Sequence, residues 1–185
     1  IRNADSITIL VVEHVAALGT SMALGAGILA LAGDAPFAYS VVTGIWVAGI
    51  GLVLLLGSWV ARMRPDRIRA IAWMSLVVAA TLAFWALAAA AFCAYWAAVF
   101  GIGAGELAKI ASGYLLAWAA GFAALFAPQG LGVFEWVAAQ VLPSDRELAV
   151  LVTVLAGFRL VTIIGDLAAW TIGALVARAR GGAAH

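Results

Sequence analysis

Charged residues are scarce in this sequence of 185 residues. Only 10% are Asp, Glu, Lys or Arg, while 66% are hydrophobic and the mean hydropathy is +1.14. A soluble domain has about 25% charged and about 45–50% apolar residues, so this chain is too apolar to fold alone in water or to be disordered. Its ten basic residues nearly balance its nine acidic ones, which excludes a nucleic-acid binder. The composition is that of a membrane protein.

Cysteine and histidine are nearly absent. The single cysteine, Cys93, lies inside the apolar run AAAFCAYWAA, which excludes a disulfide framework and a CxxC motif and predicts a small buried side chain. The two histidines, His14 and His185, form no metal-binding pattern, and the sequence offers no Ser/His/Asp or Cys/His set. We therefore expect no metal and no cofactor, and whether the chain is an enzyme stays open, with the balance against it.

The sequence consists mainly of five long apolar runs. A membrane-spanning helix needs about 20 apolar residues, whereas strands of a membrane β-barrel are about 10 residues long with alternating polarity. The runs here are between 20 and 30 residues long. They predict an all-α, multi-pass transmembrane helical bundle, formed by residues 1–185 as one domain. The predicted spans are Ile7–Ala32, Val41–Val60, Ile71–Phe100, Leu107–Phe126 and Leu148–Ala177.

Turn residues separate some of these spans. GDAP (Gly33–Pro36) follows the first, and GIGAGE (Gly101–Glu106) follows the third. The second of these predicts a turn and not a phosphate loop, because the Lys-Ser/Thr pair and a preceding strand are missing. The first residue is Ile1 and nothing before Ile7 resembles a signal peptide, so we expect the sequence to be the C-terminal part of a longer membrane domain.

The connection between the second and third spans is rich in arginine. It contains Arg62, Arg64, Arg67 and Arg69 against one acid, Asp66. Short connections with such an excess lie on the cytoplasmic side, and we expect the inner cell membrane as the location.

The charges after the last span conflict with an odd number of crossings. Five spans would place Arg178 and Arg180 outside, although they are typical of the cytoplasmic side. We predict that the segment between the fourth and fifth spans, up to Leu142, supplies a further crossing. Pro143–Glu147 would then lie on the outer side.

A helix break is predicted at APQGLGVFEW, Ala127–Trp136. Pro128 cannot donate a helical hydrogen bond, and Gly130 and Gly132 adopt backbone conformations that other residues resist. We expect the helix to break or re-enter here and to restart near Val133. Broken backbone at membrane depth is tolerated where it is buried in protein or lines a cavity.

The restarted helix could favour an anion, because its first N–H groups have no helical partner. Glu135 lies in its first turn. Either this carboxylate belongs to such a site, or it only offsets the helix dipole.

Two ionisable residues lie inside the last span. Arg159 and Asp166 are seven residues apart, which places them on one helix face together with Thr162. Ionisable groups in a span cost about 2.5–3.5 kcal/mol each on insertion scales, so they face partners or water. Either these two neutralise charges on neighbouring helices, or they line a polar cavity in which Arg159 binds an anion. The guanidinium group matches the geometry of a phosphate.

A further polar pair, Glu13 and His14, lies in the first span. A histidine can titrate near neutral pH, but a lone histidine inside a membrane is more often hydrogen-bonded packing.

The run PQGLGVFE, followed by a turn, an alanine- and leucine-rich helix and one mid-helix arginine, resembles the P-G-G-x-G-x-x-E signature of the lysylphosphatidylglycerol synthase membrane-domain family. The resemblance covers Glu106–Ala177, and Ser6–Leu18 more faintly resembles the family segment that ends in Glu-Arg. Gln129 stands where the family usually has Gly, and His14 where Arg is usual. The family contains bacterial flippase domains, so the resemblance implies a flippase-type protein that handles lipid.

We interpret the sequence as a protein that binds and translocates an anionic lipid. A membrane subunit of a lipid-modifying transferase and a helix-packing partner without ligand remain alternatives. The partner expected is the headgroup of a membrane lipid and not a nucleic acid, while a second copy or a soluble transferase stays open. The candidate lipid-binding residues are Arg159, Glu135, Gly130, Gly132, Pro128, Asp166 and Glu13.

Overall fold

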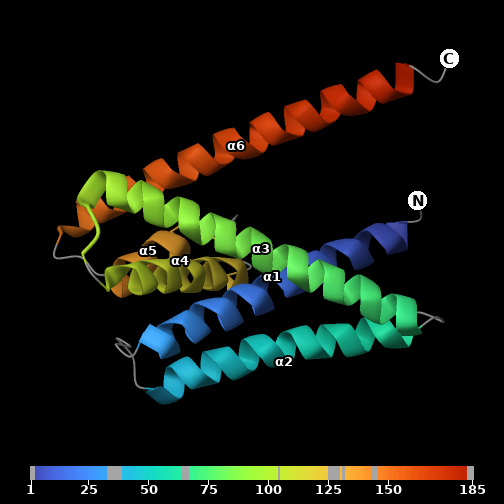
Figure 1. Cartoon of the computed structure of the whole chain (residues 1–185), viewed down its shortest axis with the longest axis horizontal. Helices are drawn as coiled ribbons and strands as arrows, with labels where there is room; N and C mark the ends of the chain where they lie inside the picture. The colour runs from blue at the N-terminus through green and yellow to red at the C-terminus, as the bar shows by residue number, and fades with distance from the viewer. Residues whose placement is uncertain are drawn as a thin grey trace. The chain divides into compact units, whose positions relative to one another are not determined.

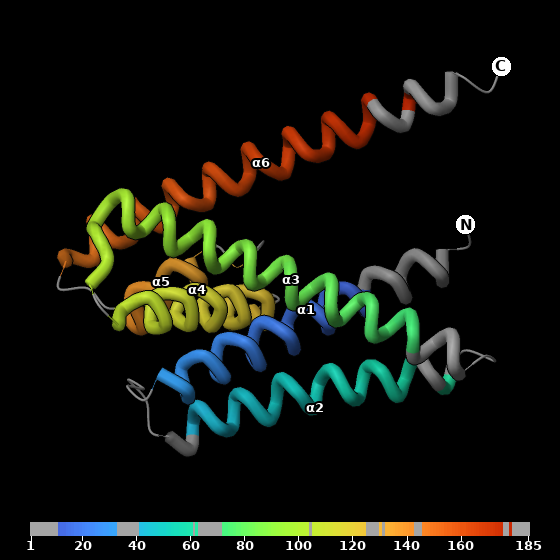
Figure 2. The backbone as a smooth tube through the Cα atoms, viewed as in Figure 1, coloured from blue at the N-terminus to red at the C-terminus, as the bar shows by residue number. Residues whose placement is uncertain are grey.

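The computed structural model describes residues 3–32, 39–63, 67–103, 105–124, 130, 132–142 and 146–182. Within these ranges the chain is all-helical, as predicted, and contains no strand (Figure 1, Figure 2). It divides into two compact units, Ile1–Asp145 and Arg146–His185. The helices are α1 (Asn3–Ala32), α2 (Tyr39–Met63), α3 (Arg67–Phe100), α4 (Glu106–Ala123) and α5 (Val133–Val141) in the first unit and α6 (Leu148–Gly182) in the second.

Four of these helices are long and apolar enough to cross a membrane, and the chain is a multi-pass integral membrane protein. The spans lie within α1, α2, α3 and α6, at four of the five predicted positions. The expected turn at Gly33–Pro36 and the centre of the arginine-rich connection, residues 64–66, lie outside the described residues. The spans are Val11–Ala32, Val41–Val60, Ala72–Phe100 and Leu148–Leu175.

The fourth predicted span differs from expectation. It forms α4, which has only 18 residues and is not among the four helices that qualify as spans. Its side chains are buried all round, since six consecutive residues from Ser112 to Ala117 are buried. Protein neighbours therefore explain its apolar composition.

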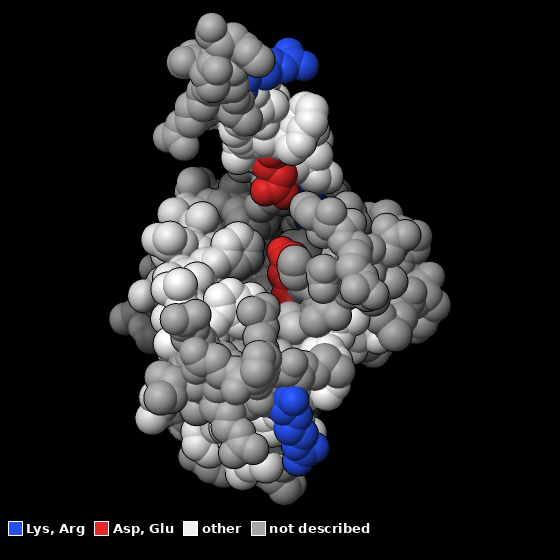
Figure 3. Space-filling model, turned by 90° about the vertical axis from the view of Figure 1, so that its right-hand side faces the viewer, with Lys and Arg blue, Asp and Glu red and all other residues white. Residues whose placement is uncertain are grey.

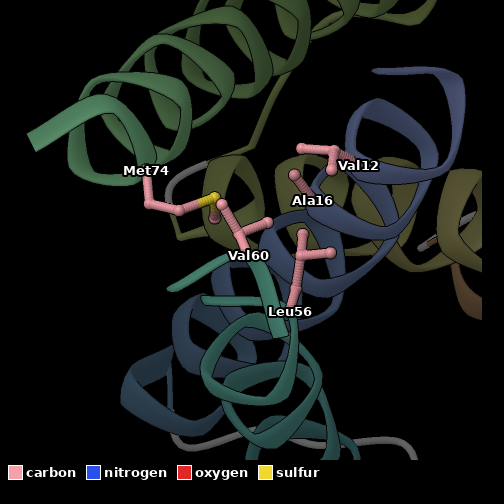
Figure 4. Close-up of a cluster of buried hydrophobic side chains, with 5 residues drawn as sticks. All are labelled: Val12, Ala16, Leu56, Val60 and Met74. Atoms are coloured by element: carbon pink, nitrogen blue, oxygen red, sulfur yellow. The ribbon is translucent and has the colours of Figure 1, made fainter. Parts of the chain in front are cut away.

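Glycines bring α1 and α2 into backbone contact. A Cβ atom added to Gly49 would lie 2.7 Å from the amide nitrogen of Ala23 and 2.8 Å from the carbonyl oxygen of Gly19. Small residues permit this close approach between membrane helices. Figure 4 shows side chains that close one end of the pair against α3, namely Val12, Ala16, Leu56, Val60 and Met74.

Aromatic rings connect α3 to α4. Phe92 stacks on Tyr114 with ring centroids 4.7 Å apart, and Trp85 lies 6.2 Å from Trp118. Residues later in α3 therefore contact residues earlier in α4, which makes the two helices antiparallel. Cys93, beside this ring stack in the sequence, is buried as predicted.

Both α3 and α4 also pack on α1. The indole Nε1 of Trp85 donates a hydrogen bond of 3.1 Å to the carbonyl oxygen of Ala17. A Cβ added to Gly25 would lie 3.0 Å from the Cβ of Leu115. The first span thus forms the centre against which α2, α3 and α4 assemble.

The predicted GIGAGE turn links α3 to α4. Gly101 and Gly105 have positive φ angles of 77° and 86°, a region that glycine adopts without steric cost. Glu106 closes the turn, because its Oε2 accepts the N–H of Gly103 at 2.8 Å. The prediction of a turn is confirmed for the described residues, which exclude Ala104.

Candidate functional site

The predicted helix break is present. The helix α4 ends at Ala123, followed by Ala124 with φ −81° and ψ 72°, and α5 begins at Val133. Between them Gly130 and Gly132 have φ angles of +65° and +82°. Residues 125–129, which include Pro128, and Leu131 lie outside the described residues. The two glycines identified from the sequence therefore do interrupt the helix.

The break turns the chain back on itself. Near the turn, the ideal Cβ of Gly121 on α4 lies 3.7 Å from the Cβ of Phe134 on α5, and farther from it that of Gly113 lies 3.0 Å from the Cδ2 of Leu142. The later residue of α5 thus meets the earlier residue of α4, which is the pattern of antiparallel helices. Phe134 is fully buried, with Trp118 5.2 Å from its ring. We call α4, the turn and α5 the α4–α5 hairpin.

Gly130 has a steric role in this hairpin. A Cβ added there would lie 2.6 Å from the Cα of Gly121 and 2.9 Å from its carbonyl oxygen, far inside normal contact distance. Its positive φ independently favours glycine. Sequence reasoning identified Gly130 but missed Gly121, whose only signal is its small size just before the break.

Gly132 and Glu135 form the start of α5. The N–H of Gly132 donates to Oε2 of Glu135 at 2.8 Å, and the carbonyl of Gly132 accepts the N–H of Trp136 at 3.0 Å. This is half of a capping box, in which an acid three residues into the helix binds the N-cap amide. Glu135 therefore has a structural role at the start of α5, and both interpretations of its carboxylate stay open. The contact is exposed, so an anion could compete for the same amide.

Glu13 and His14 lie on α1 at the level of the turn. The ring of His14 meets the edge of Phe122, 6.2 Å away with an interplanar angle of 86°. Phe122 directly follows Gly121, which Gly130 approaches. Both Glu13 and His14 have exposed side chains. The fold therefore brings three predicted features of the first unit, namely the glycine turn, Glu135 and the Glu13–His14 pair, to the same end of α4.

Arg159 and Asp166 belong to the second unit, on α6. The helix is continuous through both residues, so they lie two turns apart on one face as predicted. The hydroxyl of Thr162 donates a 2.8 Å hydrogen bond to the carbonyl of Arg159. Asp166 has an exposed side chain. Figure 3 shows one face of the molecule with the described Asp and Glu side chains in red and the described Lys and Arg side chains in blue.

Comparison of the chain with protein-family models, with curated proteins and with solved structures finds no match. The resemblance to the lysylphosphatidylglycerol synthase membrane-domain family therefore rests on the PQGLGVFE segment and its flanking pattern. Two of its residues, Gly130 and Gly132, have positive φ angles, and a third, Glu135, caps the helix that follows.

Proposed function

We propose that this membrane protein binds an anionic lipid through its phosphate and moves it across the inner cell membrane. The observation that carries the proposal is the exposed contact between the Gly132 N–H and the carboxylate of Glu135. A carboxylate already occupies this amide, so the position accepts an anionic oxygen. Helix N-termini bind phosphate through such amides.

We propose that Arg159 supplies a positive charge to the lipid phosphate. It is the only Lys or Arg between Leu148 and Ala177, and an arginine inside a span needs a counter-charge. Its planar guanidinium can bind a phosphate through two parallel hydrogen bonds. We propose that Arg159 pairs at rest with a carboxylate and exchanges that carboxylate for the lipid phosphate.

A ligand-free packing role is the second candidate, and particular contacts favour it. Gly130 is required by its approach to Gly121, and Glu135 is used as a cap. Neither contact needs a lipid. The two functions differ in what they predict for substitutions that leave the hairpin folded.

Lipid movement in reconstituted vesicles separates the two candidates. The parental protein should move a fluorescent anionic phospholipid between leaflets faster than protein-free vesicles do. Arg159→Lys keeps the charge but loses the planar fork, so we expect slower movement with unchanged folding, and Glu135→Gln should slow it as well. Arg178→Lys, near the end of α6, is the matched control and should keep the parental rate.

Folding is checked first by the thermal midpoint in detergent and by the elution volume. If folded Arg159→Lys and Glu135→Gln both moved lipid at the parental rate, the packing role would replace the lipid site. The same conclusion would follow if the parental protein moved no lipid.

A further inference from the structure

We infer that the α4–α5 hairpin is re-entrant: it enters the membrane from the outer side and leaves on that side, so that the chain crosses four times. The lengths of the two arms are the first argument. Nine residues of α5 rise about 13.5 Å, less than half of the roughly 30 Å hydrocarbon core. The short arm therefore cannot make a crossing by itself, and it runs back along α4.

The level of the turn follows from contacts with α1. Gly25, toward the Ala32 end of the first span, meets Leu115, whereas His14, toward the Val11 end, meets Phe122. The long arm α4 thus runs antiparallel to α1 and brings the turn to the level of the inner part of that span. His14 lies only three residues from Val11, where the span begins, so α4 extends through most of the depth of that span.

The short connection between α5 and α6 favours a return to the side on which α4 starts. Leu142 lies beside Gly113, in the first half of α4. Only five residues separate Leu142 from Leu148, and this stretch reaches at most about 20 Å when fully extended. Gly113 lies about 10.5 Å along the axis of α4 from Glu106 and about 15 Å from Ala123, so the start of α4 is the nearer end for this connection.

The distribution of basic residues supports this path. With the arginine-rich connection on the cytoplasmic side, α3 runs outward, the hairpin returns to the outer side, and α6 runs inward. Seven of the ten basic residues then fall on the cytoplasmic side: Arg2, the four arginines between residues 62 and 69, Arg178 and Arg180. If α4 crossed alone, the last two would lie outside.

The four-crossing path reconciles the charges without a fifth full span. It supports the expectation that the segment up to Leu142 returns the chain to the outer side, and it assigns the return to a short helix packed on α4. It does not depend on the proposed lipid function.

Cysteine accessibility tests the path in intact cells and in inverted membrane vesicles. Cys93→Ala removes the native thiol, and single cysteines are introduced as Ile102→Cys, Ser144→Cys, Met63→Cys and Gly181→Cys. A membrane-impermeant maleimide should label the first two only from outside and the last two only from inside. A permeant maleimide added after solubilisation confirms that each thiol is present and reactive.

Labelling of Ile102→Cys from outside together with Ser144→Cys only from inside would mean that α4 crosses alone and would overturn the inference. A Ser144→Cys thiol that reacts only after solubilisation would overturn it too, because the segment would then lie within the membrane. Reversed labelling of all four positions would overturn the assigned orientation.

Discussion

The carboxylate of Glu135 accepts the backbone N–H of Gly132 at 2.8 Å, and Glu106 makes the same contact with Gly103 at 2.8 Å. Each acid follows its glycine by three residues at the start of a helix. The pair at Gly103 lies in a turn to which no binding role is assigned. Glu106 is therefore an internal control that separates the capping role of Glu135 from any further role.

Removal of either carboxylate should destabilise the protein to a similar extent. Glu106→Ala and Glu135→Ala each leave a turn amide without its side-chain acceptor, and an intramolecular hydrogen bond typically contributes about 0.5–1.5 kcal/mol. Thermal unfolding in detergent should show two comparable decreases. A drop confined to Glu135→Ala would mean that its carboxylate holds more than a cap.

Gly130→Ala should destabilise the hairpin more than Gly132→Ala. Both substitutions impose positive φ on a residue with a side chain, a strain of order 1–3 kcal/mol, but only the Cβ at position 130 also meets the backbone of Gly121 at 2.6 Å. A Cβ at Gly132 meets nothing within 4 Å among the described residues. The thermal midpoint of unfolding in detergent should therefore be lower for Gly130→Ala than for Gly132→Ala.

Gly121→Ala is the matched control on the facing helix. Its Cβ would lie 3.6 Å from the Cα of Gly130, an ordinary contact, so we expect the parental midpoint. Equal decreases in thermal midpoint for Gly130→Ala and Gly121→Ala would contradict the finding that only the Cβ at position 130 is too close to the facing backbone.

A larger side chain at Gly49 of α2 should lower the stability of the protein, whereas one at Gly51, two residues later, should not. Gly49→Ala places a Cβ 2.7–2.8 Å from α1 backbone atoms, whereas Gly51→Ala meets nothing within 4 Å among the described residues. We expect a lower midpoint for the first, of order 1–3 kcal/mol as for other overpacked sites, and no loss for the second. Similar midpoints would show that the two helices do not approach at Gly49.

A disulfide should form across the hairpin. The 3.7 Å between the Cβ positions of Gly121 and Phe134 falls within the range of about 3.5–4.5 Å found in disulfides. In a Cys93→Ala background, Gly121→Cys with Phe134→Cys should cross-link under mild oxidation, measured by protease cleavage in the turn. Gly121→Cys with Trp136→Cys is the control, because Trp136 is exposed. Efficient cross-linking of the control pair alone would contradict the register.

The long spans in α2, α3 and α6 could be predicted because an uninterrupted run of about 20 apolar residues is typical of a helix that crosses a membrane. The same reasoning predicted a fourth span where the structure has the 18-residue helix α4, because burial in protein and burial in lipid select the same side chains. The break was predictable because Pro128, Gly130 and Gly132 are local signals.

The proximity of His14 to Phe122 and of Gly121 to Gly130 could not be predicted. These contacts depend on which faces of α1, α4 and α5 meet, and hydrophobic periodicity carries little information when every face of a helix is apolar. The sequence alone supports two interpretations of Glu135 for a related reason. Its hydrogen bond to the Gly132 amide is local and could be anticipated, whereas a role in lipid binding leaves no local signal.

The proposal that Glu135 serves an anionic lipid is tested most directly by the lipid-transfer rates of Glu135→Gln and Glu106→Gln, reconstituted at equal protein density. Each change neutralises a carboxylate that caps a glycine amide at 2.8 Å, so any general effect of weaker capping is shared. Our account predicts the parental rate for Glu106→Gln and a rate at least several-fold lower for Glu135→Gln. Equal rates for the two variants would contradict it and leave Glu135 as a helix cap.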